Sequence, residues 1–264
     1  MQKYIVIADD LTGSNATCSL LKKIGLRAAS ILKLQNGMRY DTDVISYSTG
    51  SRGLNKEEAY KRVSEVIKIL KDKNVLVYNK RIDSTLRGNI GAEINAMLDN
   101  LENDRIAVVV PAYPDSKRIV VNKTMLVNGV LLENSDAGKD PKTPIKTSCV
   151  ETLIQKDCKY SSTYFELADI EQPIEKLIKK IQKSTEKSRV LIFDAVNNED
   201  IIKISRAIIQ SNINIITVDP GPFTLYFSKE LQKEKHLEKK ILMLIGSVTE
   251  TTKKQIEYIQ FVFL

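Results

Sequence analysis

The chain has 264 residues, of which 42% are hydrophobic and 28% charged, and its formal net charge is +7. This composition argues against a largely disordered chain, and no apolar run approaches the ~20 residues that span a bilayer. The opening residues, MQKYIVIADD, reach two aspartates too early for the apolar region of a signal peptide, so we expect one or two globular domains in the cytoplasm.

The positive charge has two explanations, a lysine-rich solvated surface or a nucleic-acid interface. Most lysines lie in helix-like stretches, and the sequence lacks arginine–aromatic interleaving, zinc-ligand spacing and a basic helix-turn-helix signal. We therefore expect no nucleic-acid partner and no membrane partner. A mildly positive field would help to collect a small anionic substrate.

Cysteine and histidine are scarce. The 3 cysteines form no CxxC motif, so free buried thiols are expected. The single histidine, His236, argues against a Ser-His-Asp triad and against a histidine-ligated metal. A carboxylate-bound magnesium stays open.

Short runs rich in β-branched residues predict strands along most of the chain. Several of them are apolar at every position, which is typical of strands buried on both faces of a parallel sheet. Amphipathic helical patterns at 55–70, 171–181 and 199–209 alternate with them. This alternation predicts an α/β fold with a mainly parallel sheet flanked by helices. The predicted strands span residues 3–8, 27–31, 43–47, 75–79, 106–110, 189–193, 213–218 and 241–245.

The first polar motif, IVIADDLTGSNAT, follows the first predicted strand. Asp9 and Asp10 stand where that strand ends and a helix begins, which is where parallel sheets bind ligands. They could hold substrate hydroxyls or a metal, and Gly13 would let backbone N–H groups approach an anion. A helix cap is the structural alternative. It explains one aspartate, but not two aspartates followed by Thr12 and Gly13.

The second polar motif, VYNKRIDSTLRGNIGAEI (77–94), also follows a buried strand and leads into a helix. Its second arginine offers a planar fork that suits a carboxylate. The alternative is an arginine–aspartate network that pins a loop. The candidate ligand contacts of this motif are Lys80, Asp83, Ser84, Arg87, Gly88 and Asn89.

Other predicted strand ends carry further candidates. Arg52 follows strand 43–47, and Arg118 follows the PAYPDSKR turn. Segment 218–224, VDPGPFT, fits a structural turn as well as a binding role. No GxGxxG or GxxxxGK[ST] motif occurs, and the Asp-x-Asp spacing of a haloacid-dehalogenase-type site fails after the first strand, because residue 11 is leucine. Together the strand ends suit a small polyhydroxylated acid, with arginines and a lysine for its carboxylate and aspartates for its hydroxyls.

The middle of the chain departs from the α/β pattern. Asn128-Gly129 lies between two apolar runs, which is a strong signal for a type I′ turn. We expect an antiparallel hairpin excursion around 118–134. The two prolines in 138–148 predict an extended loop after it, and this excursion could form a flap over a site.

Several of these motifs recur in order in the four-carbon acid sugar kinase family. The segments IADDLTG, KRIDSTLRGNIGAE, VNGVLLE and GSVT carry the resemblance, which covers residues 3–260. It implies ATP-dependent phosphorylation of a sugar acid such as threonate, erythronate or 3-oxo-tetronate at its terminal hydroxyl. By matching motifs, the implied acid-binding region contains Asp9, Asp10, Thr12, Arg52, Lys80, Asp83, Ser84 and Arg87.

The resemblance also implies ATP and Mg²⁺ as cofactors, with Ser247 as an early nucleotide contact. Family members continue past GSVT into a nucleotide-binding domain with a glycine-rich loop, whereas this chain ends after one further helix. We therefore expect a sugar-acid-binding domain at 1–235 and only the start of the nucleotide domain at 236–264, with most of the ATP site missing. The motifs assign no catalytic base.

The chain departs from the family pattern at several positions. Ala16 stands where the family often has aspartate, Cys18 replaces a glycine, and an aromatic–histidine pair is lost within 116–125, although Arg118 remains. The substrate preference is therefore not carried over from the family.

Two functions fit these observations. The first is a sugar-acid kinase of which this chain is the acid-binding part, inactive alone because it is truncated, frameshifted or one half of a split enzyme. A separately encoded C-terminal half would then be a partner, and a homo-oligomer is also compatible. The alternative is a non-catalytic sugar-acid binding module.

Overall fold

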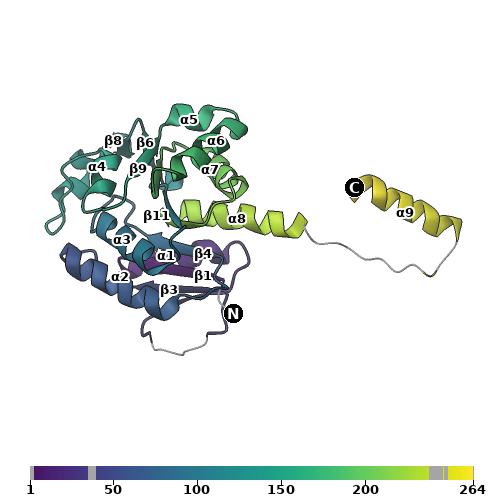
Figure 1. Ribbon diagram of the computed structural model, residues 1–264, viewed down its shortest axis with the longest axis horizontal. Coiled ribbons are helices and arrows are strands. Elements are labelled where there is room, and N and C mark those ends of the chain that lie inside the picture. Colours follow the sequence, from purple (N-terminus) through teal and green to yellow (C-terminus); the bar gives the residue numbers. More distant parts are fainter. Residues whose placement is uncertain (1–2, 35–39, 238–245, 247–248, 264) are drawn as a thin grey trace. The chain divides into compact units, whose positions relative to one another are not determined.

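The computed structural model describes residues 3–34, 40–237, 246 and 249–263 (Figure 1). The chain divides into two compact units, Met1–Gln232 and Lys233–Leu264. The predicted strand 241–245 and Ser247 lie outside the described residues. No helix in the described part of the chain is both long and apolar enough to cross a membrane.

The first unit is built on one sheet of eight strands, and every neighbouring pair in it is parallel. Most of these strands are buried along their whole length, because helices cover both faces of the sheet. In spatial order the strands are β2 (Ala28–Ile31), β3 (Val44–Ser48), β1 (Tyr4–Ala8), β4 (Val77–Arg81), β11 (Ile215–Asp219), β5 (Ile106–Val109), β10 (Val190–Phe193) and β9 (Ser162–Phe165).

The predicted fold class is confirmed, and all the strands predicted up to residue 218 are present. The sequence patterns missed β9, Ser162–Phe165. This strand lies at the edge of the sheet, and only Phe165 of its four residues is buried. A run with so little apolar character does not show the continuous pattern of the central strands.

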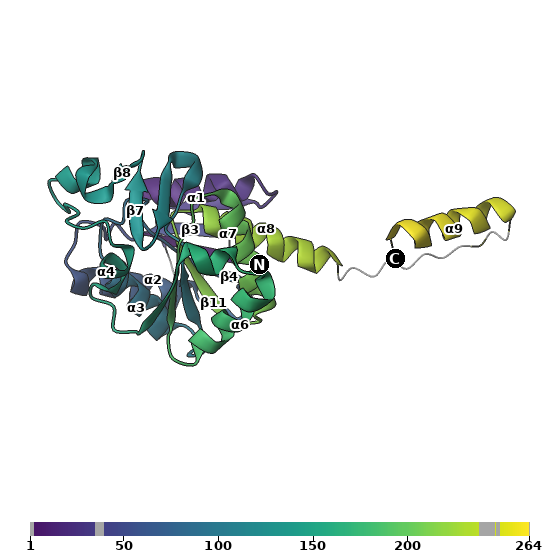
Figure 2. The ribbon, with the colours of Figure 1, turned by 90° about the horizontal axis from the view of Figure 1, so that it is seen from above.

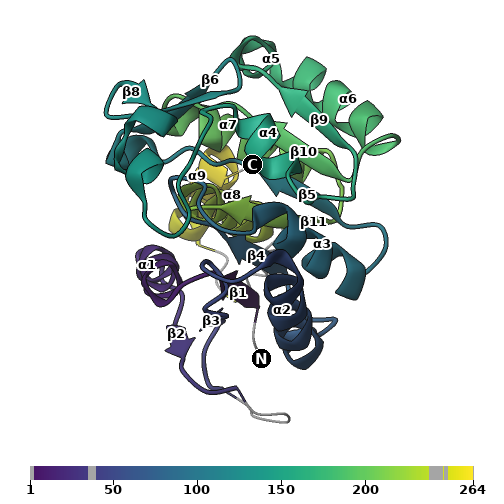
Figure 3. The same ribbon diagram turned by 90° about the vertical axis from the view of Figure 1, so that its left-hand side faces the viewer.

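Helices of the first unit pack on both sides of the sheet. Figures 2 and 3 show α1 on one face and α2 and α3 on the other. The helix predicted from residue 171 begins at Ile174 instead, because Pro173 is its N-cap and a separate short helix ends at Glu171. The helices are α1 (Leu11–Lys22), α2 (Lys56–Leu70), α3 (Ile90–Asn100), α4 (Val150–Gln155), α5 (Leu167–Glu171), α6 (Ile174–Thr185), α7 (Asn198–Gln210), α8 (Pro222–Leu237) and α9 (Glu250–Phe263).

The predicted hairpin excursion is confirmed as a separate antiparallel sheet of β6 (Arg118–Val121), β7 (Thr124–Val127) and β8 (Val130–Leu131). Asn128 and Gly129 join β7 to β8 with φ angles of 51° and 82°, as a type I′ turn requires. A second two-residue turn, Asn122-Lys123, joins β6 to β7 with φ angles of 48° and 65°. The sequence did not predict this turn, because the pair lacks the glycine that usually marks one.

Three short 3₁₀ helices complete the connections around this small sheet. They are η1 (Pro114–Ser116), η2 (Leu132–Asn134) and η3 (Asp136–Lys139). A bridge between Val120 and Ala195 attaches the small sheet to the residues after β10. The Lys123 backbone N–H also donates to Asp194 at 3.2 Å.

The register of the central strands brings the candidate residues to one edge of the main sheet. Ala8, the last residue of β1, pairs with Ser48 of β3 and with Arg81 of β4. Arg81 in turn pairs with Asp219 at the end of β11. The loops that follow these strands therefore start at the same level, which is where α/β sheets bind ligands.

Candidate functional site

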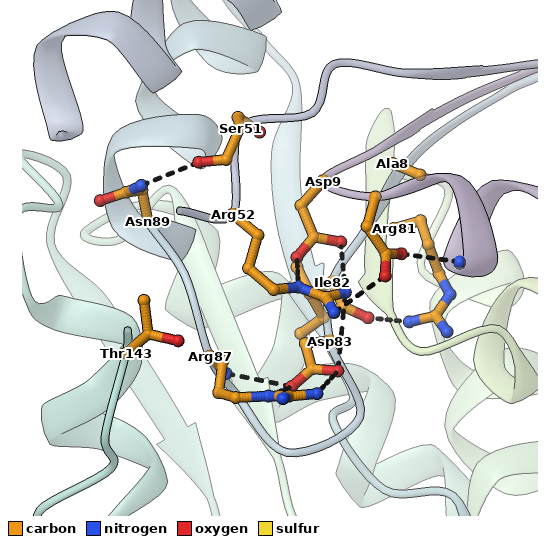
Figure 4. Close-up of polar contacts among 12 residues, drawn as sticks. Ala8, Asp9, Ser51, Arg52, Arg81, Ile82, Asp83, Arg87, Asn89 and Thr143 are labelled. Atoms are coloured by element: carbon orange, nitrogen blue, oxygen red, sulfur yellow. Dashed lines mark hydrogen bonds and ion pairs between the residues drawn. The ribbon is translucent and has the colours of Figure 1, made fainter. Parts of the chain in front are cut away.

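The centre of the site is the Arg52 guanidinium, which lies between carboxylates from two other loops (Figure 4). Its Nε and Nη2 donate to the two oxygens of Asp9 at 2.6 and 3.1 Å, which is bidentate pairing. Nη2 also lies 3.6 Å from Asp83 Oδ1. Arg52 thus links the loops that follow β1, β3 and β4.

Arg87 extends this network away from the sheet. Its Nε and Nη2 donate to the two oxygens of Asp83 at 2.6 and 3.1 Å, and its Nη1 donates to Asp140 Oδ2 at 2.9 Å. The result is an alternating series, Asp9–Arg52–Asp83–Arg87–Asp140, which we call the ion-pair chain. The arginine–aspartate network given above as the alternative to a ligand contact is present here, and the ligand-binding role of these residues stays a prediction.

Asp10 joins the ion-pair chain from the side. It is the N-cap of α1, and its Oδ1 accepts from the Gly13 backbone N–H at 2.7 Å. Its Oδ2 lies 2.8 Å from Arg52 Nη1. A Cβ on Gly13 would lie 2.8 Å from Asp10 Oδ1 and 3.3 Å from Arg81 Cγ, so a larger residue would displace this carboxylate from the helix cap.

Burial and pairing set the protonation of the ion-pair chain. Burial alone would raise the pKa of Asp83, but the hydrogen bond from Arg87 and the charge of Arg52 outweigh it and lower that pKa to about 2. Backbone N–H groups of Thr143 and Lys142, together with Arg87, lower the pKa of Asp140. Both carboxylates are therefore ionised at neutral pH.

Lys80 lies below the ion-pair chain, inside the protein, with its side chain 0% exposed. Its Nζ pairs with Glu93 Oε2 at 2.9 Å and donates to the carbonyls of Ile7 and Arg81 at 3.2 and 2.9 Å. These three contacts use all the N–H groups of an ammonium. In this structure Lys80 ties strand ends together, and its contact with substrate stays a prediction.

The backbone of the 81–89 loop is shaped by two unusual residues. Leu86 is 2% exposed and adopts φ 57°, a left-handed conformation that is rare for a bulky residue. Gly88 has φ 99°, and a Cβ there would lie 3.4 Å from Arg52 Cγ. Asn89 holds the neighbouring loop by donating to the carbonyls of Ser51 and Leu54 at 3.2 and 2.9 Å.

The structure thus brings most predicted residues together, though not all of them. Thr12 is exposed and Ser84 is half-buried, and neither side chain has a hydrogen bond among the described residues. Arg118 lies apart from the ion-pair chain, at the start of β6, where its Nη1 donates to the Ser116 carbonyl at 2.8 Å.

Two more aspartates lie at strand ends and serve the fold. Asp219 is fully buried and accepts from the backbone N–H groups of Gly221 and Thr224 at 2.7 and 3.1 Å and from Asn79 Nδ2 at 2.9 Å. Asp194 accepts from Tyr164 Oη at 2.7 Å and from Leu167 N at 3.1 Å. Burial raises the pKa of both carboxyls. The VDPGPFT segment is therefore a structural turn in this fold.

Residues 4–227 match the family described as the sugar-binding N-terminal domain. The chain belongs to this family. A D-erythronate kinase of Heliobacterium modesticaldum is 40% identical over 269 residues, which cover 98% of this chain and 61% of the relative. A D-threonate kinase of Salmonella typhimurium is 30% identical over 258 residues, covering 97% of this chain and 60% of the relative. The resemblance to four-carbon acid sugar kinases is confirmed, and the chain spans about three fifths of these relatives' length.

Solved structures share the fold of this sugar-binding family member. A crystal structure of a Haemophilus influenzae protein matches with a TM-score of 0.76 and 25% identity, over 97% of this chain and 65% of that one. A Bordetella bronchiseptica structure, described as a domain-swapped dimer with bound citrate, matches with a TM-score of 0.73 and 24% identity, over 98% of this chain and 63% of that one.

The kinase relatives imply Mg²⁺, and the aspartates of the candidate site are paired with arginine in the described part of the chain. Within the described ranges no group of three or more His, Cys, Asp or Glu side chains is placed to hold a metal. Asp9, Asp10 and Asp83 are each paired with Arg52.

Sequence reasoning missed three contributors to the site of this family member. Arg81 is 7% exposed beside α1, and burial lowers its pKa. Glu93 is the buried partner of Lys80. Asp140 closes the ion-pair chain from a loop more than 50 residues downstream of Arg87. Arg81 and Glu93 both lie within the KRIDSTLRGNIGAE segment, so both had a local signal.

Proposed function

We propose that this chain binds a four-carbon sugar acid at the carboxyl edge of its main sheet. The observation that carries the proposal is the linkage of Asp9, Arg52 and Asp83 across three strand ends, within the region that matches a sugar-binding family. The kinase relatives act, by their names, on D-erythronate and D-threonate, and this supports an acid of that length.

The ion-pair chain is suited to recognising hydroxyl groups. An ionised carboxylate accepts hydrogen bonds from hydroxyls, and each oxygen of Asp9 accepts one hydrogen bond from Arg52, which leaves a further lone pair. A hydroxyl that binds Asp83 would replace one of the hydrogen bonds from Thr85 or Arg87. Arg52 and Arg87 hold these carboxylates in fixed orientations before a ligand arrives, which lowers the entropy cost of binding. Thr12, Ser84, Asn89 and the backbone near Gly13 and Gly88 would complete the contacts.

We further propose that the whole protein is an ATP-dependent kinase that phosphorylates the terminal hydroxyl of this acid. The names of the relatives support this activity. The relatives themselves are longer than the part that the chain matches. In this view residues 1–235 bind the acid, 236–264 begin the nucleotide domain, and Ser247 contacts the nucleotide. ATP would arrive with Mg²⁺ on its phosphates, since phosphoryl transfer depends mainly on positioning and charge neutralisation.

On this proposal the chain alone binds the acid without turning it over. A non-catalytic sugar-acid binding module is the second candidate, and it predicts the same binding. The two differ when the remaining part of a kinase relative is supplied as a separate polypeptide, because only a kinase part would then convert the acid. A cytoplasmic location and a homo-oligomer are parts of the same proposal.

Calorimetry with D-erythronate and D-threonate tests the binding. We expect saturable binding by the 264-residue chain and a loss of ~10- to 100-fold in affinity for Asp83→Asn, because a charge-assisted hydrogen bond to the ligand is removed. Asp99→Asn is the control, since Asp99 is an ion-paired carboxylate with Lys159 away from the sheet edge. If neither acid binds the wild-type chain, the proposal is wrong.

A further inference from the structure

A cavity of about 350 Å³ lies between the small antiparallel sheet and the 81–89 loop. Thr85 forms its wall on the side of the main sheet, and the other lining residues come from β6, the β7–β8 hairpin and the segment that follows it. These residues are Arg118, Val127, Asn128, Val130, Asn134, Ser135, Asp136 and Ala137.

Arg118 is the only arginine or lysine in this lining, and not all of its N–H groups are hydrogen-bonded. Nη1 donates to the Ser116 carbonyl at 2.8 Å. Nε is buried and has no hydrogen-bond partner among the described residues.

Arg52 and Arg87, by contrast, are already paired with carboxylates. Arg52 pairs with Asp9, Asp10 and Asp83. Arg87 pairs with Asp83 and Asp140. An incoming carboxylate would have to displace these internal carboxylates and would meet their repulsion.

Arg118 meets no such competition, since no carboxylate pairs with it within the described ranges. Asp136 also lines the cavity, but this residue is exposed, so solvent screens its charge.

We propose that Arg118 is the anchor for the substrate carboxylate, and that the cavity places the hydroxyl-bearing carbons toward Asp83. This inference rests on the proposed sugar-acid binding and gives the acid a direction in the site. It replaces the expectation that Arg52, Arg87 and Lys80 receive the carboxylate. Those three cations instead hold the aspartates and the strand ends in position.

Thr85 connects the cavity to the ion-pair chain. Its side chain lines the cavity, and its Oγ1 donates to Asp83 Oδ2 at 2.6 Å. A ligand whose carboxylate lies on Arg118 and whose chain passes Thr85 therefore reaches Asp83 next. Asn128 and Ser135 supply further polar groups at the wall.

The test compares an acid with its uncharged analogue by calorimetry, using D-erythronate and erythritol on the full chain. We expect Arg118→Gln to weaken D-erythronate binding by ~10- to 100-fold, the effect of losing a charge-assisted hydrogen bond, and to leave erythritol binding unchanged. Arg118→Lys should retain part of the preference for the acid, because it keeps the charge but loses the planar fork. Arg206→Gln is the matched control, since Arg206 pairs with Glu230 on an exposed surface.

A second variant covers the case in which Arg118→Gln does not fold. Asn134→Asp adds a negative charge to the cavity wall at an exposed, isosteric position and should also weaken the acid but not erythritol. If the acid preference persists in both variants, the assignment of Arg118 is wrong while sugar-acid binding stands. If the wild-type chain binds neither compound, the proposed function fails and this assignment fails with it.

Discussion

Lys80 Nζ and Glu93 Oε2 lie 2.9 Å apart in an ion pair whose side chains are 0% and 1% exposed. The pair joins β4 to α3 directly below the loops of the candidate site. Ser51 donates to the same carboxylate from the loop that carries Arg52. The loop that carries Arg52 is therefore hydrogen-bonded to this buried charge pair.

Removing one partner of this pair should destabilise the protein strongly. In Lys80→Met the Glu93 carboxylate would stay buried without its counter-charge, which costs ~3–5 kcal/mol. Urea unfolding measures this loss, and it should be smaller at low pH, because protonation makes Glu93 neutral. The double variant Lys80→Met/Glu93→Leu should lose less than the sum of the single variants. Additive losses would contradict the pairing.

The Asp83 carboxylate predicts a pH-dependent contribution to stability. Its folded pKa of about 2 lies below the ordinary value of 3.8, so its contribution is present above pH ~4 and is lost as the pH falls toward 2. The shift corresponds to about 2 kcal/mol. Unfolding free energies of wild type and Asp83→Asn should therefore differ at pH 7 and converge near pH 2. Asp41→Asn, at an exposed surface pair, should follow the wild-type profile.

The main sheet was predictable because its central strands are continuously apolar and end in polar clusters. Asp9, Arg52 and Asp83 could be assigned to one sheet edge for that reason alone, since parallel strands end on the same side. The pairing among them could not be predicted. Whether an arginine meets a ligand or an aspartate depends on loop geometry, and Asp140 reaches Arg87 from a loop with no local pattern.

The surroundings of Lys80 could not be predicted from the sequence either. From the sequence, a lysine at a strand end is a reasonable ligand contact, because its charge and position suit an acid. The alternation of side chains along β4 turns Lys80 toward α3. Its ion-pair partner there is Glu93, in the first turn of a helix that begins at Ile90. That relationship exists only after the helix has packed against the sheet.

Gly13 should not tolerate alanine. Alanine usually stabilises a helix interior relative to glycine, but here its Cβ would lie 2.8 Å from Asp10 Oδ1. Asp10 would have to leave the N-cap, and we expect a net loss of ~1–2 kcal/mol in thermal or urea unfolding, together with weaker acid binding. Gly53→Ala is the control, because no atom lies within 4 Å of a Cβ there, and its stability should change by ~0.5 kcal/mol or less.

The Arg87–Asp140 pair should hold the 138–148 loop against the site. Asp140 Oδ2 accepts from Arg87 at 2.9 Å, while its Oδ1 accepts from the Lys142 and Thr143 backbone N–H groups at 3.0 and 2.9 Å. Asp140→Ala removes all three contacts, so local opening of the loop becomes easier. We expect limited trypsin digestion to cleave at the lysines of this loop ~5- to 30-fold faster, which corresponds to 1–2 kcal/mol.

A control variant distinguishes loss of the Arg87–Asp140 pair from a general loss of stability. Asp136→Asn changes a carboxylate in the same segment for which no ion pair is present within the described ranges, and its digestion rate should match wild type. Urea unfolding of Asp140→Ala should show a smaller change than the local effect, because the loop is the main region released. Equal digestion of Asp140→Ala and wild type would mean that other contacts hold the loop and that Arg87 serves Asp83 alone.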